Sequence, residues 1–311
     1  MTNSRPSRPS PRLRRVIAII GGLATAVLWA STLLGSARAA RLIGPWSTLA
    51  WVMLIGLAVA LPLVVITGSA VILTEQDIVN LSIAGVANSG GLLLGYAALR
   101  RGKVAVVGPI VSTEGAIGAV LAILAGDPVT AAVGVLLAVI AIGVVLASVE
   151  RSHERAVAEV RDSRPNPDSS GRSAAITASL AVGAAVLFGV NLFVTSRLAN
   201  ALPIAWSILP ARLAGVVGVS LPLLITRRIH LQRDAVPYLL LVGLAEVAGI
   251  TTFALGARDS APVTSVIASQ FAGIAAITAF VLFGERLSRI QVAGVVVIAL
   301  GVAGLTAIRA G

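Results

Sequence analysis

The sequence contains no cysteine and only two histidines, His153 and His230, in 311 residues. The missing thiols exclude disulfides, thiolate metal ligands and cysteine nucleophiles. Both histidines lie in polar connections between apolar segments, which leaves no residue set for a zinc or di-iron centre. We therefore expect no metal and no cofactor.

Charge is also scarce, because charged residues make up 12% of the chain and hydrophobic residues 57%. Soluble domains carry about 25% charged residues, so a soluble fold of this composition could not cover its surface with polar groups. The formal net charge of +11 then belongs to loops that fix orientation in a membrane. No soluble domain is left to present a basic face to nucleic acid. The predicted partners are the lipid bilayer and a small-molecule substrate, and the oligomeric state stays open.

Long apolar runs predict an all-α integral membrane protein with ten transmembrane helices, since a bilayer core needs roughly 20 apolar residues per helix. The Ser-, Pro- and Arg-rich residues 1–15 indicate a disordered tail, and no clear signal-peptide cleavage site follows them. The expected spans are 16–36, 44–66, 78–99, 103–125, 129–149, 174–197, 204–226, 235–257, 262–283 and 287–308.

A polar linker at residues 150–172 divides these spans into two sets of five, residues 16–149 and residues 173–308. An offset of 158 residues aligns landmarks of the two sets without a gap: Gly85 with Gly243, Gly115 with Gly273, and Gly126-Asp127 with Gly284-Glu285. An odd number of helices per repeat makes the second copy enter the membrane from the opposite side. The sequence therefore predicts two inverted five-helix repeats, with a substrate site near the midplane between them.

The residues that mark the repeats also resemble a known family. Phe283-Gly284-Glu285-Arg286-Leu287 opens the last span, Ala125-Gly126-Asp127-Pro128 is its weaker first-half version, and Leu187-Phe188-Gly189-Val190-Asn191 lies in the first span of the second repeat. Together they resemble the EamA-like branch of the drug/metabolite transporter superfamily, over residues 16–308. The resemblance implies a transporter with a ten-helix fold and says almost nothing about its substrate. Asp127 replaces the usual Glu, and Gly115 stands where many relatives have proline.

Three charged residues fall near the middle of expected spans: Glu114, Arg212 and Glu246. A charge at the bilayer centre costs about 2.5–3.5 kcal/mol on insertion scales, so each needs a reason. Arg212 could form a structural ion pair with one carboxylate, but it cannot fully neutralise two separate acids. A desolvated carboxyl without a partner favours its protonated form. Glu114, which the resemblance also supports, and then Glu246 are therefore candidates for proton coupling or for binding a cationic group of the substrate.

Uncharged polar residues accompany these acids on the third, fourth, eighth and ninth spans. Asn88 aligns with Glu246 under the repeat, and Ser112 aligns with Gln270. Each could form only a helix–helix hydrogen bond, worth about 0.6 kcal/mol, but their convergence favours a cavity where these spans are expected to meet. Trp29 is expected deeper in the membrane, and it either lines that cavity or packs in the core. Trp46 and Trp206 are expected in the interfacial belt.

The Gly-acid pairs are predicted to be structural, because an acid at a helix N-terminus gains about 0.3–1 kcal/mol from the helix dipole. No Gly-rich nucleotide-binding loop appears, so ATP hydrolysis by this chain is not expected. The sequence thus predicts a secondary transporter in the plasma or inner membrane that exports small organic metabolites, amino-acid-like or drug-like, and is not an enzyme. The alternatives are a membrane scaffold or receptor and a lipid-modifying membrane protein.

Orientation stays open at this point. The connections on the side of the 150–172 linker hold most of the Lys and Arg, and the positive-inside rule therefore puts both termini outside. The resemblance implies both termini in the cytoplasm. Ten spans place the two termini on the same side in either case.

Overall fold

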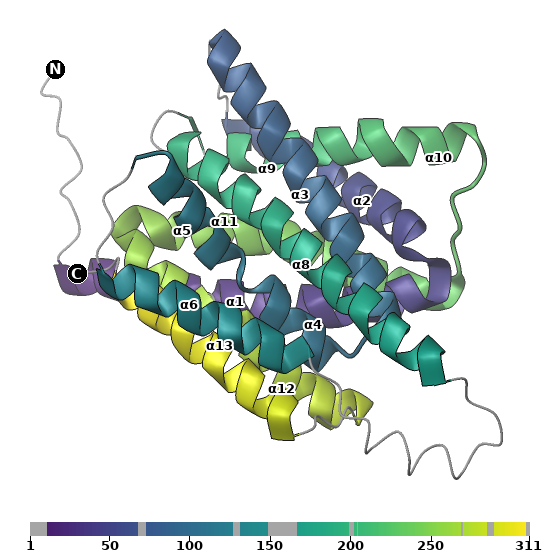
Figure 1. Ribbon diagram of the computed structural model, residues 1–311. Helices are drawn as coiled ribbons and strands as arrows, with labels where there is room; N and C mark the ends of the chain where they lie inside the picture. Colours follow the sequence, from purple (N-terminus) through teal and green to yellow (C-terminus); the bar gives the residue numbers. More distant parts are fainter. Residues whose placement is uncertain are drawn as a thin grey trace, which may run out of the picture.

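The computed structural model describes residues 11–67, 73–126, 131–148, 167–198, 202–203, 205–268, 270–284 and 289–308, and the regular elements in these ranges are all helical. The first half contains α1 (Pro11–Ile43), α2 (Pro45–Thr67), α3 (Glu75–Arg101), α4 (Val104–Val111), α5 (Glu114–Leu124) and α6 (Ala131–Ser148). The second half contains α8 (Pro167–Leu198), α9 (Ala205–Gly215), the π-helical turn η1 (Val216–Ser220), α10 (Leu221–Ile225), the 3-10 turn η2 (Arg233–Ala235), α11 (Val236–Ala268), α12 (Phe271–Phe283) and α13 (Arg289–Ile308). Figure 1 shows these helices as one bundle.

The bundle has the length and polarity of a multi-pass membrane protein. Six described segments are long and apolar enough to cross a bilayer: Val16–Ile43, Pro45–Pro62, Glu75–Arg101, Ser173–Thr195, Ile208–Ile225 and Arg233–Gly256. Three shorter apolar helices, Val104–Gly118, Phe271–Leu282 and Val292–Gly301, add to them. Large apolar side chains such as Ile225 and Leu124 are 80% and 78% exposed on the outside, where lipid rather than water suits them. The set is compatible with the ten predicted spans.

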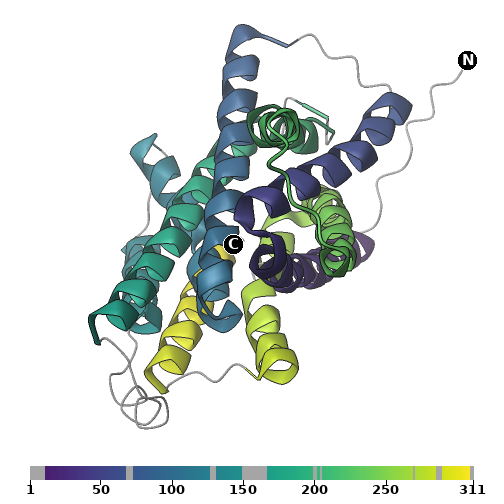
Figure 2. The ribbon, with the colours of Figure 1, turned by 90° about the vertical axis from the view of Figure 1, so that its right-hand side faces the viewer.

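Helix packing follows the predicted repeat. α1 packs along α11, and α8 packs along α3, so each half lays its first helix on the third helix of the other half. The matched helices α2 and α9 pack against each other, as do α6 and α13. Figure 2 shows α3 and α8 side by side from a second direction. Exchanging the halves leaves this pairing scheme unchanged, as a pseudo-two-fold axis requires.

One pair of contacts displays this symmetry at atomic scale. A Cβ on Gly91 of α3 would lie 2.8 Å from the Phe188 ring of α8, and a Cβ on Gly249 of α11 would lie 2.6 Å from Nε1 of Trp29 on α1. Gly249 follows Gly91 at the offset that aligns Gly243 with Gly85. Small residues let membrane helices approach closely, and here an aromatic ring from the partner repeat covers each glycine.

One expected boundary differs from the structure. Residues 167–172, placed in the linker, are helical because α8 begins at Pro167. Proline suits the first helical position and Asp168 suits the positive helix N-terminus. The connection expected at 258–261 has a helical backbone within α11, but the chain reverses across it, because a Cβ on Gly256 would lie 2.9 Å from Oγ1 of Thr264, eight residues later, whereas eight residues of one straight helix span about 12 Å. At two other helix ends, left-handed glycines follow the last turn: Gly126 (φ 96°) after α5 and Gly284 (φ 64°) after α12.

The fourth expected span, 103–125, is broken into α4 and α5. Pro109 cannot donate a backbone hydrogen bond inside α4, and the hydroxyls of Ser112 and Thr113 donate to the carbonyls of Pro109 (2.8 Å) and Ile110 (2.7 Å). The break recurs between α11 and α12. Thr113 before α5 (φ −72°, ψ −2°) and Gln270 before α12 (φ −74°, ψ −3°) have nearly the same backbone conformation. The repeat thus conserves a discontinuous helix in each half.

The bundle has two ends, which we name by their connections. At the terminal face, in the left half of Figure 1, α1 and α3 begin and α8 and α13 end. At the linker face, on the right, α1 ends, α6 ends and α8 and α11 begin. The linker residues 150–166 themselves, like Asp127 and Glu285 of the Gly-acid pairs, lie outside the described residues.

Candidate functional site

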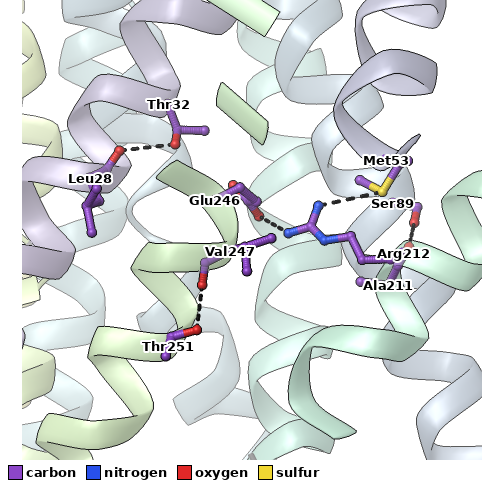
Figure 3. A network of polar contacts seen from close by, with 9 residues as sticks. All are labelled: Leu28, Thr32, Met53, Ser89, Ala211, Arg212, Glu246, Val247 and Thr251. Carbon is purple, nitrogen blue, oxygen red and sulfur yellow. Dashed lines mark hydrogen bonds and ion pairs between the residues drawn. The ribbon is translucent and has the colours of Figure 1, made fainter. Parts of the chain in front are cut away.

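The most deeply buried charge of the described chain is Arg212 on α9, whose exposed fraction is 0%. A notch in α2 accommodates it, because a Cβ on Gly56 would lie 2.9 Å from both Cδ and Nε of Arg212. Nη1 of Arg212 donates to the Met53 sulfur at 3.7 Å, as Figure 3 shows. The π-helical turn η1 follows directly, and its Ser220 hydroxyl donates to the Ala50 carbonyl at 2.9 Å. The guanidinium is therefore held between α9 and α2.

Arg212 faces the carboxylate of Glu246 on α11. Nη2 of Arg212 lies 3.6 Å from Oε1 of Glu246, and both side chains are buried. Nε and Nη2 of Arg212 make no hydrogen bond within the described part of the chain. Glu246 therefore neutralises the charge of Arg212 but does not use all of its N–H donors, so the guanidinium can still donate hydrogen bonds. Arg212 thus compensates the charge of Glu246, one of the two central acids, and leaves Glu114 without a partner arginine among the described residues.

Glu114 is the second acid, and its surroundings differ. It is the first residue of α5, directly after the break in the fourth span, and it is partly exposed. Its carboxylate has no hydrogen bond or ion pair with any described residue, and Glu246 is the charge that acts on it. At this position the positive end of the α5 dipole favours a negative group. The structure therefore separates a paired acid, Glu246, from an unpaired one, Glu114.

Two buried polar groups on α3 complete the central region. Oδ1 of Asn88 and the hydroxyl of Tyr96 are buried, and within the described residues neither has a hydrogen-bond partner. The Tyr96 hydroxyl interacts electrostatically with both Glu246 and Arg212. The polar residues singled out from the sequence do not include Tyr96, although a tyrosine inside an apolar span is a usable signal in a chain with only two tyrosines. The hydroxyl of the neighbouring Ser89 donates a hydrogen bond to the Ala211 carbonyl at 3.0 Å.

The remaining polar candidates, Ser112 and Gln270, lie at the two helix breaks. Ser112 is buried and its hydroxyl donates to the Pro109 carbonyl, and Gln270 stands at the N-cap position of α12 without a side-chain capping hydrogen bond. The sequence alignment matched Ser112 with Gln270, but the structure matches Thr113 with Gln270, so the register slips by one residue at the break. α3 packs on α8 and α9, and α11 packs on α1 and α2. Of the expected meetings at the centre, the fourth and ninth spans do meet, as α4 against α12, whereas α3 has its most extensive contact with α8 and α11 has its most extensive contact with α1.

Trp29 lies in an aromatic cluster beside the charges. Its ring stacks on Phe253 at a centroid distance of 5.8 Å and an interplanar angle of 24°, and it meets Phe271 edge-on at 5.8 Å. Such pairs contribute about 0.5–1.5 kcal/mol beyond burial. Thr32 and Thr251, drawn in Figure 3, donate to carbonyls of their own helices. Trp29 is partly buried and packed, one turn from Glu246 through its contact with Gly249.

A cleft lies next to the charge pair, towards the terminal face. The space among its lining side chains, counted together with the open solvent outside, is about 330 Å³, and two of those side chains, Leu81 and Ala84, are only 7% exposed. The cleft is lined by Leu81, Ala84 and Gly85 of α3, by Asn191, Thr195 and Leu198 of α8, and by Leu202, Trp206, Pro210 and Ala211 at and before α9. Trp206 has a buried Nε1 without a hydrogen-bond partner among the described residues, and Trp46 is 55% exposed; their place in the interfacial belt stays a prediction.

The arrangement can bind charge but offers no metal centre in the part of the chain that is described, where no three His, Cys, Asp or Glu residues gather. A buried guanidinium with free donors can hold an anionic group, and an unpaired carboxylate can hold a proton or a cation. Intramembrane ionisable groups of this kind are typical of substrate and ion pathways.

Comparison with known proteins agrees with this geometry. A solved crystal structure of a protein superposes with a TM-score of 0.63 at 17% sequence identity, covering 95% of this chain and 99% of the other, which shows a shared fold. No curated protein matches the sequence. The model of the EamA-like transporter family matches residues 16–149 and again residues 175–307, one match for each five-helix repeat. This chain is a multi-pass membrane protein and belongs to the EamA-like transporter family.

Proposed function

We propose that this chain is a secondary active transporter that exports small organic metabolites, amino-acid-like or drug-like, across the plasma or inner membrane. It works by alternating access, with protons as the coupling ion. The observation that carries the proposal is the unpaired carboxylate of Glu114 in the middle of the bundle, within range of the Arg212–Glu246 pair.

Glu114 suits a coupling site better than Glu246 does. A carboxylate must exchange its proton with water to couple transport, and Glu114 is partly exposed while Glu246 is buried against Arg212. The energetic cost of an unpaired intramembrane acid is also hard to explain in a scaffold or receptor. Proton binding at Glu114 changes the charge within range of Glu246, and this favours a different arrangement of the ion pair in each protonation state.

The substrate binds, in this proposal, among Arg212, Glu246, Asn88 and the aromatic cluster of Trp29. The unused N–H groups of Arg212 donate hydrogen bonds to an anionic group of the substrate. The Trp29 ring contacts the planar or apolar part of the substrate. Ser112 and Gln270 lie at the two helix breaks, where backbone groups become available to a ligand.

The test is flux in proteoliposomes with a metabolite panel and an internal pH indicator. The variant Glu114→Gln should abolish proton-coupled flux while its elution from size exclusion stays native. Glu75→Gln is the matched control, because Glu75 is an exposed acid in the first turn of α3, and it should transport as the native protein does. Native proton coupling in both Glu114→Gln and Glu246→Gln would contradict the proposal.

A further inference from the structure

The connection between α10 and α11 crosses the linker face and is strongly basic. It runs down the right side of Figure 1 from the end of α10. Residues 224–234 include Arg227, Arg228 and Arg233, and their one acid is Asp234. All three arginines are exposed. The connection therefore presents positive charge at the level where this face meets the edge of the membrane.

The corresponding connection of the first half is uncharged. The motif Leu61-Pro62-Leu63 of α2 corresponds to Leu221-Pro222-Leu223, and from this motif residues 64–74 correspond to residues 224–234. Residues 64–74 contain no charged side chain. The two connections lead to helices that begin at opposite faces, since α3 begins at the terminal face and α11 at the linker face. The repeat therefore does not account for the arginines.

Arg227 has a backbone conformation that usually requires glycine. Its φ is 53°, and the other described residues with a positive φ are all glycines. The Arg227 amide donates to the Leu224 carbonyl at 3.1 Å, and the Arg228 amide donates to the Leu223 carbonyl at 2.9 Å. These two bonds form a Schellman motif, in which glycine is the usual left-handed residue. Arginine is strained there, and such strain typically marks a functional position.

Two simpler roles do not explain an arginine at position 227. A cation at a helix C-terminus interacts favourably with the helix dipole, but Arg228 already supplies one with an ordinary φ. The positive-inside rule counts the charges of a connection, so any unstrained position would serve it equally well. What the strained residue adds is a second guanidinium directly beside Arg228, and guanidinium groups suit the bidentate binding of phosphate.

The backbone of this connection is fixed to the start of α2. The Trp51 Nε1–H donates to the His230 carbonyl at 3.1 Å, and the His230 amide donates to the Ser47 hydroxyl at 3.0 Å. Two apolar side chains of the connection are exposed, Ile225 by 80% and Leu231 by 54%. A fixed backbone lowers the entropic cost of binding. Arginine beside exposed aliphatic side chains suits the boundary between lipid headgroups and acyl chains.

We propose that the connection between α10 and α11 is a binding site for anionic phospholipids. Arg227 and Arg228 donate hydrogen bonds to the lipid phosphate, and Ile225 and Leu231 contact the adjoining part of the acyl chains. The occupant is a lipid rather than a soluble anion, because exposed aliphatic side chains on both sides of the arginines suit acyl chains. The site shares no residue with the proposed substrate site, so it does not depend on the transport function.

The test titrates the full chain in neutral detergent with phosphatidylglycerol or phosphatidylcholine and follows bound lipid by native mass spectrometry. The native protein should bind the anionic lipid about 25-fold more tightly than the zwitterionic one, since each arginine near the lipid contributes about fivefold. Arg227→Gly should therefore lower the affinity for phosphatidylglycerol about fivefold. Arg227→Gly combined with Arg228→Gln should remove the preference.

Arg101→Gln is the matched control, because Arg101 is an exposed arginine at the end of α3 on the same face but outside the connection. It should bind phosphatidylglycerol as the native protein does. Equal losses in Arg227→Gly and Arg101→Gln would show attraction to total charge and would overturn the site.

Thermal unfolding separates lipid binding from folding. Without added lipid, Arg227→Gly should unfold at the native temperature or above it, because glycine adopts the left-handed backbone without strain. Phosphatidylglycerol should raise the unfolding temperature of the native protein more than that of the variant, since a ligand stabilises the state that binds it. Earlier unfolding of Arg227→Gly in lipid-free detergent would show a structural role for Arg227 and overturn the assignment.

Two further measurements distinguish a lipid from a soluble anion. Leu231→Ser keeps both arginines and should still weaken phosphatidylglycerol binding several-fold. Inorganic phosphate should displace the bound lipid no better than chloride at the same ionic strength. Specific displacement by phosphate, or native affinity in Leu231→Ser, would show an anion site without acyl contact and would overturn a lipid as its occupant.

Discussion

The two halves of this molecule share a scaffold and differ in charge. Each half covers a glycine of its third helix with an aromatic ring, Phe188 on Gly91 and Trp29 on Gly249. Three residues before those glycines, the first half has Asn88 and the second half has Glu246. Arg212, the partner of Glu246, also belongs to the second half, whereas the unpaired Glu114 belongs to the first. The helix packing therefore follows the symmetry of the repeats, whereas the charged residues of the central region depart from it.

The largest expected effect concerns the inversion of the halves. Reporter fusions placed after Ser148 and after Ile308 should give opposite signals, because α6 ends at the linker face and α13 ends at the terminal face. The same fusions decide orientation, which basic residues of the linker face such as Arg100 and Arg227 assign to the cytoplasm by the positive-inside rule. Equal signals from both fusions would remove the five-plus-five architecture.

Breaking the charge asymmetry should destabilise the second half strongly. Arg212→Ala leaves Glu246 buried without its partner, which typically costs about 3–5 kcal/mol, so thermal unfolding in detergent should shift far down. The double variant Arg212→Leu, Glu246→Leu should recover most of that loss. Asn88→Leu, the matched change in the first half, removes only a neutral group without a described partner and should cost little. An Arg212→Ala protein as stable as the native chain would show that the pair is not a structural element.

The two aromatic-on-glycine contacts should respond alike. Gly91→Ala and Gly249→Ala each place a Cβ under 3 Å from a ring, and overpacking typically costs about 1–3 kcal/mol. Thermal unfolding of both variants should therefore drop by similar amounts, with Gly249→Ala rescued by Trp29→Leu. If one glycine tolerates alanine and the other does not, the contacts are not equivalent.

The smallest effect is expected at the helix ends. Gly126→Ala and Gly284→Ala force alanine into a left-handed conformation, at about 1–2 kcal/mol. Gly273→Ala is the control, because it lies within α12 and its added Cβ meets nothing within 4 Å. Its unfolding temperature should stay near the native value. A comparable drop in unfolding temperature for Gly273→Ala and Gly284→Ala would contradict the role of the left-handed backbone at Gly284.

The sequence predicted the spans, the two repeats and the positions of the central charges, because apolar length and residue spacing record them directly. It did not predict which helices pair, since lipid provides little hydrophobic preference among helices and contact depends on small residues from distant segments. The one-residue slip that matches Thr113 with Gln270, and the start of α8 at Pro167, depend on local backbone geometry. Tyr96 and the cleft at Trp206 depend on three-dimensional packing that no spacing rule encodes.

The notch at Gly56 ties two distant positions of the chain together. The guanidinium of Arg212 occupies the space that any side chain at position 56 would fill. A lineage could therefore not gain a side chain at position 56 while keeping arginine at position 212, nor could it lose the arginine without leaving a void against α2. Positions 56 and 212 should covary among homologues, and glycine at the first should accompany arginine at the second.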